Sequence, residues 1–251
     1  MARSRETVQA PIGVAASGID VLDRAMAILF AFRRNDVPLT LTELAARTGL
    51  YKSTALRLAT ALCHHRFLMR LEDGRFLLGS APLNLAATYH STLNLGDILL
   101  PLMRRLNSAL GEAVSFHVRE GDQRVCLYRI HSQHSIRAEV RQGDIQPLDR
   151  GAGGRILLAF SGKPGALYDE VRRSFFYISL GERDAETSGI SVPVFGAQQA
   201  LVGALGMVGP ISRMGQVEMQ QYKSQLLACA ADASAMFGAD ASALRDAANI
   251  L

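Results

Sequence analysis

Two helix-initiation signals separated by one glycine restrict most strongly how this chain folds. Thr40-Leu41-Thr42-Glu43 has the form of a capping box, in which the threonine hydroxyl and the glutamate carboxylate satisfy amides at a helix start. Gly49 stands where a helix ends in a left-handed residue, and helical spacing resumes at Lys52-Ser53-Thr54, with Leu58 and Leu62 inward. The pattern predicts two short helices joined by a tight turn, a helix-turn-helix.

The flanking segments extend this motif. Apolar residues from Ile19 to Phe30 recur at helical spacing and stop before Pro38, which predicts a preceding helix. After His65, two apolar runs enclose Glu72-Asp73-Gly74, and Asp-Gly between apolar runs is a strong hairpin signal. We therefore expect a winged helix-turn-helix over residues 18–80, preceded by a flexible arm at residues 1–17.

The charge of the chain is concentrated in this first third. Residues 1–80 hold 11 Lys and Arg against 7 Asp and Glu, whereas residues 81–251 hold 16 of each sign. Six of the basic residues fall between Arg47 and Arg75. A basic module attached to a larger neutral one predicts double-stranded DNA as the partner of the first and a different partner for the second.

The candidate DNA contacts gather at the start of the second helix of the motif. They are Tyr51, Lys52, Ser53, Thr54 and Arg57, with Arg75 at the hairpin tip. Arg57 can bond a guanine edge with two donors, while Lys52 and its neighbours suit phosphates. Arg75 is placed to reach the minor groove. The alternative is a solvated helix on a small helical domain.

The rest of the chain mixes strands and helices without strict alternation, which predicts an α+β domain. We expect a connecting linker helix at 81–96, a second domain at 97–240 and a C-terminal tail at 241–251. Within the domain the patterns predict helices at 97–110, 155–160 and 215–237, and strands at 113–119, 123–131, 135–141, 190–195 and 200–208.

A glycine-rich turn at residues 151–154 is the main candidate binding feature of the second domain. Amides at the start of a helix, followed by Arg155, offer donors and positive potential to a carboxylate. A nucleotide site fits less well, because Ile156 stands where GxGxxG has its third glycine and no Lys followed by Ser or Thr forms a P-loop. The alternative is that the glycines allow close helix-to-sheet packing, with Arg155 in solvent.

Several motifs resemble those of the IclR-type transcriptional regulators. They are Leu41-Thr42-Glu43-Leu44-Ala45, Thr48-Gly49-Leu50-Tyr51-Lys52-Ser53-Thr54, Arg150-Gly151-Ala152-Gly153-Gly154-Arg155 and Val192-Pro193-Val194-Phe195. The resemblance covers residues 18–238 and rests on the order and spacing of the motifs. It implies a winged helix, a linker helix used in dimerisation, and a GAF-like domain that binds a small metabolite. It also implies dimers or tetramers on palindromic operators, acting as repressors or activators.

The resemblance also implies which residues bind the effector. Position by position they are Ala152, Gly153, Ser179, Gly189, Gly206 and Val208, and the physical argument about the turn adds Gly154 and Arg155. Members that bind very small keto acids have a cysteine at the position of Gly189 and serines at those of Gly206 and Val208. A roomier, less polar pocket is therefore expected, which favours a carboxylate with an apolar or aromatic body.

Other kinds of site are less well supported. Cys126, His131 and His134 could supply metal ligands for a metal-responsive regulator, but an odd separation places Cys126 and His131 on opposite faces of a strand. A DNA-binding protein without an effector is a further alternative. Catalysis is not expected, because GxSxG and HExxH are missing, and no cofactor is implied.

The cysteines and the N-terminal sequence indicate the compartment. The three cysteines are far apart and form no CxxC, as expected of reduced thiols in the cytoplasm. The N-terminus carries no apolar stretch, and the longest nearly uncharged run is too short and glycine-rich to span a membrane. We expect a cytoplasmic protein without a membrane partner.

Overall fold

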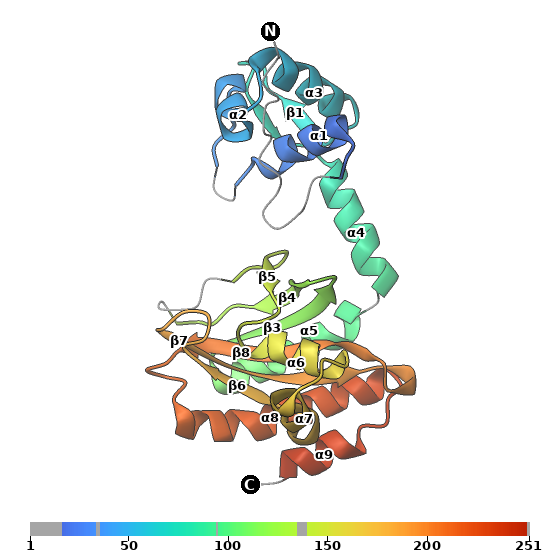
Figure 1. The fold of residues 1–251 in the computed structure, drawn as a ribbon, viewed down its shortest axis with the longest axis vertical. Coiled ribbons are helices and arrows are strands. Elements are labelled where there is room, and N and C mark those ends of the chain that lie inside the picture. Colours follow the sequence, from blue (N-terminus) through green and yellow to red (C-terminus); the bar gives the residue numbers. More distant parts are fainter. Residues whose placement is uncertain (1–16, 34–35, 94, 135–139, 250–251) are drawn as a thin grey trace. The chain divides into compact units, whose positions relative to one another are not determined.

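The structure is a computed structural model that describes residues 17–33, 36–93, 95–134 and 140–249 (Figure 1). The chain divides into two compact units, Met1–Leu93 and Asn94–Leu251. Most of the expected arm at residues 1–17 lies outside the described residues.

The first unit is a winged helix-turn-helix. Its elements are α1 (Asp20–Phe30), α2 (Leu41–Thr48), α3 (Lys52–His64), β1 (Leu68–Arg70), β2 (Phe76–Leu78) and α4 (Ala81–Leu93). Both halves of the capping box form: the Glu43 amide donates to Thr40 Oγ1 at 3.2 Å, and the Thr40 amide donates to Glu43 Oε2 at 2.7 Å. Gly49 has φ +70°, the left-handed geometry that ends α2. The expected helix-turn-helix is confirmed.

The hairpin that forms the wing is antiparallel and closes through residues 71–75, with Gly74 at φ +85°. Leu39 bridges to Phe76 through two backbone hydrogen bonds of 2.9 and 2.7 Å, which ties the segment before α2 to the wing. Buried apolar residues from α1, α2, α3 and the wing form one core, which includes Ile28, Leu44, Leu58 and Phe76.

The second unit is an α+β domain, as expected. Its helices are α5 (Leu95–Leu110), α6 (Ala152–Phe160), α7 (Ala166–Ser174), α8 (Gln216–Met236) and α9 (Ser242–Asn249), with a 3-10 turn at Ala197–Gln199. Its strands are β3 (Ala113–Glu120), β4 (Gln123–Ile130), β5 (Ile145–Pro147), β6 (Tyr177–Leu180), β7 (Thr187–Phe195) and β8 (Leu201–Pro210). They form one antiparallel sheet in the order β5-β4-β3-β8-β7-β6.

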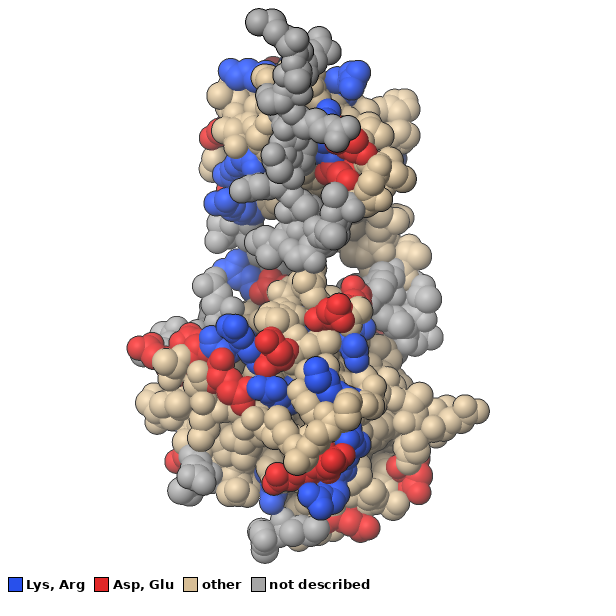
Figure 2. Space-filling model, viewed as in Figure 1, with Lys and Arg blue, Asp and Glu red and all other residues tan. Residues whose placement is uncertain are grey.

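Helices cover both faces of this sheet. The larger core joins α5, α8 and α9 to one face through residues such as Leu99, Phe116, Ile190 and Leu227. A smaller core joins α6 and α7 to the other face through Ala204. Figure 2 shows acidic and basic side chains interspersed on the visible face of this unit, in keeping with its balanced charge.

Three expectations about elements change. The expected strand at 135–141 is not found at residues 140–141, and residues 135–139 lie outside the described part; the edge strand β5 forms at Ile145–Pro147 instead. The expected helix at 97–110 begins already at Leu95. The expected tail at 241–251 contains α9, because Leu244 and Ala248 are buried against the body of the unit and Ser224 Oγ donates to the Ala248 carbonyl at 2.7 Å.

No helix in the described part of the chain is long and apolar enough to cross a membrane.

Candidate functional site

The outer face of α3 presents the residues expected to contact DNA. Ala55, Leu58, Ala59 and Leu62 are buried against α1, α2 and the wing. Tyr51 is 68% exposed, Lys52, Ser53 and Arg57 are exposed, and Thr54 is half-buried. The amphipathic spacing of α3 therefore leaves its N-terminal turn and Arg57 accessible, as a helix that enters a major groove requires.

Arg75 on the wing is held by a neighbouring carboxylate. Its Nε donates to Asp73 Oδ2 at 2.7 Å, and this contact lowers the pKa of Asp73. Both side chains are exposed, so the pair is weak enough to exchange for a phosphate.

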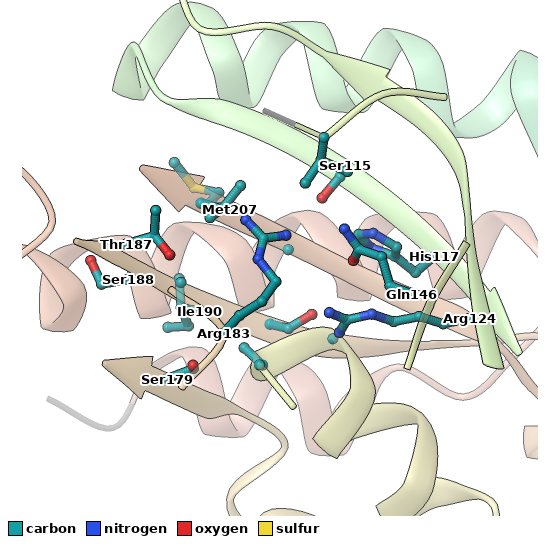
Figure 3. A pocket seen from close by; sticks show the side chains of 18 of the residues that line it. Ser115, His117, Arg124, Gln146, Ser179, Arg183, Thr187, Ser188, Ile190 and Met207 are labelled. Atoms are coloured by element: carbon teal, nitrogen blue, oxygen red, sulfur yellow. The ribbon is translucent and has the colours of Figure 1, made fainter. Parts of the chain in front are cut away.

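A cavity in the second unit brings together most of the expected effector residues (Figure 3). It holds about 490 Å³ of empty space, including the part that opens to solvent. Its lining comes from β3, β4, β6, β7 and β8, the segment 140–146, the turn before α6 and the turn before β7: Ser115, His117, Arg124, Arg129, Val140, Gln146, Gly151, Ala152, Gly153, Ser179, Arg183, Thr187, Ser188, Gly189, Ile190, Ser191, Gly206, Met207 and Val208.

Strand alternation explains why the cavity lies on this face of the sheet. Side chains of a strand point alternately to its two faces. On β3, Val114 and Phe116 enter the larger core, while Ser115 and His117 line the cavity. Paired strands continue the same row: Ser115 stands opposite Gly206, which stands opposite Ser191.

Two glycines on the sheet leave room for the cavity because they carry no side chain. A Cβ at Gly206 would lie 2.8 Å from Ser191 Oγ, and one at Gly189 would lie 3.0 Å from the Met207 carbonyl oxygen. Ser179 on β6 pairs with Gly189 on β7. Side chains at these glycines would occupy the space between the sheet and α6.

An irregularity in β4 directs two arginines to the same face. His117 pairs with Cys126 and Phe116 pairs with Tyr128, so Leu127 is an extra residue in β4. In a regular strand Arg124 and Arg129 would face opposite sides, but the bulge reverses the alternation and both line the cavity. The same bulge removes the alternation argument that separated Cys126 from His131, which lies beyond the end of β4.

Arg124 and His117 are buried polar groups aimed into this cavity. Arg124 is 4% exposed and His117 is 7% exposed. Within the described residues, Arg124 Nε and both ring nitrogens of His117 have no hydrogen-bond partner. Native interiors rarely leave such groups unsatisfied, so these two side chains make the cavity a candidate binding site.

The electrostatics of the cavity are positive. Burial, and then the charges of Arg124, Arg129 and Arg183, hold the pKa of His117 well below its ordinary value, so the ring is neutral at neutral pH. Burial and the charge of Arg183 lower the pKa of Arg124 to about 10, which still leaves the guanidinium charged. No Asp or Glu is among the described lining residues.

The turn before α6 closes one side of the cavity. Gly151 caps the helix at φ +74°, and Gly151, Ala152 and Gly153 line the space. A Cβ on Gly153 would stand 3.0 Å from Arg124 Nη1 and 3.5 Å from His117 Nδ1. The glycine-rich turn thus lies directly against the buried cationic side chain.

Two of the expected effector residues do not line the cavity. A Cβ on Gly154 would lie 2.2 Å from the Leu148 carbonyl oxygen, so Gly154 permits close backbone packing instead. Arg155 points to Glu182, with Nε and Oε2 3.4 Å apart, and its Nη1 lies 3.3 Å from the Tyr168 hydroxyl. The countercharge expected from Arg155 is supplied by Arg124, which reaches the turn from β4.

The polar side of this cavity is not indicated by the sequence motifs. Ser115, His117, Arg124, Arg129 and Arg183 make the lining more polar than the positions of Gly189, Gly206 and Val208 predicted. One signal was present: Arg124 and Arg129 interrupt an otherwise apolar strand, and arginines are seldom buried without a specific partner.

In the described residues, no three His, Cys, Asp or Glu side chains gather in a way that could hold a metal ion. Cys126 is buried, with Sγ 3.6 Å from the Tyr128 carbonyl oxygen.

Comparisons with known proteins cover both units. The family model of the IclR helix-turn-helix domain matches residues 21–72, and that of the bacterial transcriptional regulator IclR C-terminal domain matches residues 87–166 and 165–235. The HTH-type transcriptional regulator KipR of Bacillus subtilis (strain 168) is 26% identical over 211 residues, which cover 74% of this chain and 84% of KipR.

Solved structures share the fold. The Thermotoga maritima IclR has a TM-score of 0.74 at 19% identity, covering 88% of this chain and 99% of its own. An IclR homologue of Microbacterium hydrocarbonoxydans, complexed with 4-hydroxybenzoate, has a TM-score of 0.75 at 23% identity, covering 87% and 99%. Because the family models match more than half of its residues, in the order that the two units require, the chain belongs to the IclR family of bacterial DNA-binding transcriptional regulators.

Proposed function

We propose that this regulator changes its affinity for a palindromic operator when a small organic acid binds in the cavity of the second unit. The observation that carries the proposal is the burial of Arg124 and His117, without hydrogen-bond partners for Arg124 Nε and the His117 ring nitrogens, in a cavity whose described lining contains no carboxylate. A carboxylate would neutralise the guanidinium and accept hydrogen bonds that the protein itself does not satisfy.

The first unit supplies the contacts to DNA. We assign base recognition to Arg57 and phosphate contacts to Lys52, Ser53 and Thr54, with Tyr51 and Arg75 at the edges of the interface. Their exposure on one face of α3 and on the wing supports this assignment. Two such helices on two half-sites require a homodimer or homotetramer.

The body of the acid follows from the cavity walls. Ala152, Gly189, Gly206 and Val208 offer small or apolar surface beside the polar side. The Microbacterium hydrocarbonoxydans homologue is complexed with 4-hydroxybenzoate, an aromatic carboxylate, which supports an acid with an aromatic body as the ligand of this cavity.

The mechanism is a shift between two arrangements of the regulator. An acid that binds one arrangement more tightly increases its population, and the two recognition helices then match or miss their half-sites. Such a ligand can act on DNA binding only through this difference in affinity.

A thermal-shift screen of aliphatic and aromatic acids tests the proposal. An acid at 100 times its Kd should stabilise the second unit by about 2.7 kcal/mol. Gly153→Val should abolish the shift, because its side chain displaces the Arg124 guanidinium 3.0 Å from the glycine Cβ position. Ala166→Val, which adds the same side chain at an exposed position of α7, should keep it.

The stabilising acid should then change operator affinity in a gel-shift titration. Stabilisation by sugars or cationic amines only, or an equal shift in Gly153→Val, would refute the carboxylate site. An acid that binds without any change in operator affinity would refute its regulatory role.

A further inference from the structure

The cavity holds more positive charge than one carboxylate neutralises. Arg124 comes from β4 and Arg183 from the turn between β6 and β7, and Figure 3 shows both side chains directed into the same space. Among the described residues, neither guanidinium forms an ion pair. Their like charges repel, and the charge of Arg183 contributes to the lowered pKa of Arg124.

A carboxylate next to Arg183 in sequence, that of Glu182, is already engaged with other groups. Glu182 precedes Arg183, but its Oε1 accepts the Tyr177 hydroxyl at 2.6 Å. Its Oε2 accepts the Gly151 amide at 3.2 Å and lies 3.4 Å from Arg155 Nε. Glu182 is not part of the cavity lining, so its role is to fix the turn that carries Arg183 beside the start of α6.

Neutral groups complete the polar side without adding negative charge. Gln146 Oε1 is buried without a hydrogen-bond partner in the described structure, and the neutral His117 ring offers one donor and one acceptor. These groups can fix the orientation of a ligand. Arg129 also lines the cavity but has an interaction of its own, so the two cations without an ion pair among the described residues are Arg124 and Arg183, and a ligand with two negative charges balances them together.

We propose that the effector is a small dicarboxylate, with one carboxylate on Arg124 and the turn before α6 and the other on Arg183. The inference rests on the proposed acid site and specifies its ligand class. It predicts that a second carboxylate at the far end of the same carbon body raises affinity, because each carboxylate gains a charge-assisted hydrogen bond in a partly dehydrated site.

Isothermal titration of the full chain with matched acids tests this ligand class. The pairs are butyrate against succinate and benzoate against terephthalate, with inorganic phosphate as a compact dianion. For the pair whose body fits, we expect the dicarboxylate to bind at least about tenfold more tightly than its monocarboxylate.

Two variants locate the second charge. Arg183→Gln should reduce the ratio of the dicarboxylate's affinity to that of its matched monocarboxylate to less than about threefold, since it removes one cationic partner. Arg173→Gln makes the same change at an exposed position of α7 outside the cavity, and should keep the full advantage.

The outcomes separate this inference from the proposed function. Equal or tighter binding of the monocarboxylates, or an advantage that survives in Arg183→Gln, would overturn the dicarboxylate while leaving the acid site intact. Tight binding of phosphate without the dicarboxylates would also overturn it. Failure of every carboxylate to bind would overturn both.

Discussion

At the residue scale, buried cationic and polar groups in the second unit lack partners within the described structure. Arg124 and His117 would be better satisfied in water, so their burial reduces the stability of the ligand-free unit. The unit tolerates this cost because its larger core is extensive and apolar. Stability and ligand binding therefore make opposite demands on the same side chains.

The low pKa of His117 predicts that the ligand-free unit loses stability in acid. As pH falls below about 6.5, the unfolded chain binds a proton at this residue, whereas the folded ring, surrounded by Arg124, Arg129 and Arg183, does not. The free energy of unfolding contributed by His117 should fall below that pH and stay constant above it.

Calorimetric unfolding of the second unit between pH 5.5 and 7.5 measures this effect. His117→Gln should flatten the dependence, while His64→Gln, at an exposed position of the first unit, should not. An identical slope in wild type and His117→Gln would contradict the prediction.

On the recognition helix, Arg57 and Lys52 should differ in what they contribute. Arg57→Ala should cost about 1–3 kcal/mol at the operator and weaken discrimination at one base pair per half-site. Lys52→Ala should weaken binding to all DNA sequences alike and lower the salt dependence of that binding. Gel-shift titrations at several salt concentrations measure both quantities, and unchanged affinity in both variants would remove α3 from the interface.

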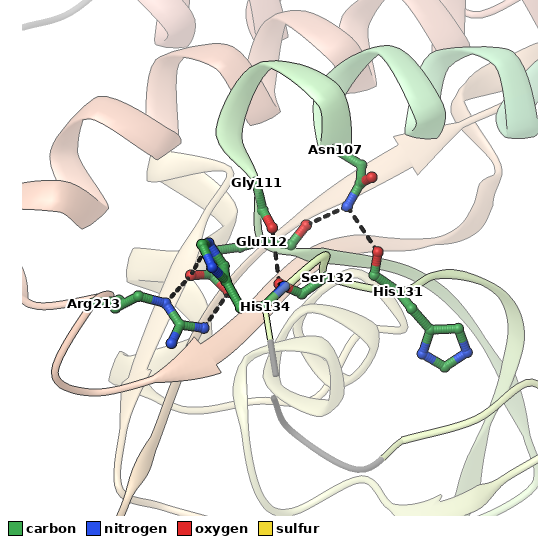
Figure 4. A network of polar contacts seen from close by, with 7 residues as sticks. All are labelled: Asn107, Gly111, Glu112, His131, Ser132, His134 and Arg213. Atoms are coloured by element: carbon green, nitrogen blue, oxygen red, sulfur yellow. Dashed lines mark hydrogen bonds and ion pairs between the residues drawn. The ribbon is translucent and has the colours of Figure 1, made fainter. Parts of the chain in front are cut away.

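At the scale of elements, a polar network joins the end of α5 to the sheet (Figure 4). Asn107 Nδ2 donates to the carbonyls of Glu112 at 2.8 Å and His131 at 3.2 Å, and Ser132 Oγ donates to the Gly111 carbonyl at 2.8 Å. The network holds the segment after β4 against the C-terminal end of α5.

The buried carboxylate of this network makes a prediction about stability. Glu112 is 3% exposed and accepts Arg213 Nε at 2.6 Å and Nη2 at 3.2 Å. Arg213→Met should destabilise the second unit by about 3 kcal/mol, because it removes the arginine partner of a buried carboxylate; in the described part of the chain the other ion-pair partner is His134 Nε2, 4.0 Å away.

Chemical denaturation of the second unit measures the loss. The double variant Glu112→Gln/Arg213→Met should recover most of it, since it removes the charge together with its partner. A double variant as unstable as Arg213→Met alone would show that packing, rather than the buried charge, dominates.

At the scale of the whole molecule, α4 presents apolar side chains that its own unit does not cover. Leu83 is 74% exposed and Leu85 is 57% exposed, and Ala86 is exposed beside them. In the sequence, Tyr89 and Leu93 continue these apolar residues as one stripe of the helix, and their side chains lie outside the described part. We expect this stripe to pack against its two-fold mate in a homodimer, because buried apolar surface drives association.

Sedimentation at micromolar concentration tests the dimer. Leu83→Glu should shift wild-type dimers toward monomers by placing a charge in the apolar contact. Asn84→Glu adds the same charge at an exposed neighbouring position and should leave assembly intact. A wild-type protein that sediments as a monomer would contradict the proposal.

The sequence by itself determined the first unit, because the signals there act over a few residues. The capping box joins Thr40 to Glu43 three positions away, and Gly49 and Gly74 adopt the left-handed geometry that their places in a helix end and a hairpin require. The order of strand-like and helical stretches, without strict alternation, likewise indicated the α+β class of the second unit.

Only the tertiary structure decided which side chains meet in the cavity. Arg124, His117, Arg183 and Gly153 come from four separate segments. The strand order that brings these segments together cannot be predicted from local sequence patterns. One extra residue in β4 reverses the alternation and brings Arg124 and Arg129 to the same face, whereas Arg155, next to the turn in sequence, is directed to Glu182. Long-range pairing and a single bulge therefore set the charge of the site, because alternation along a strand depends on register and not on residue type.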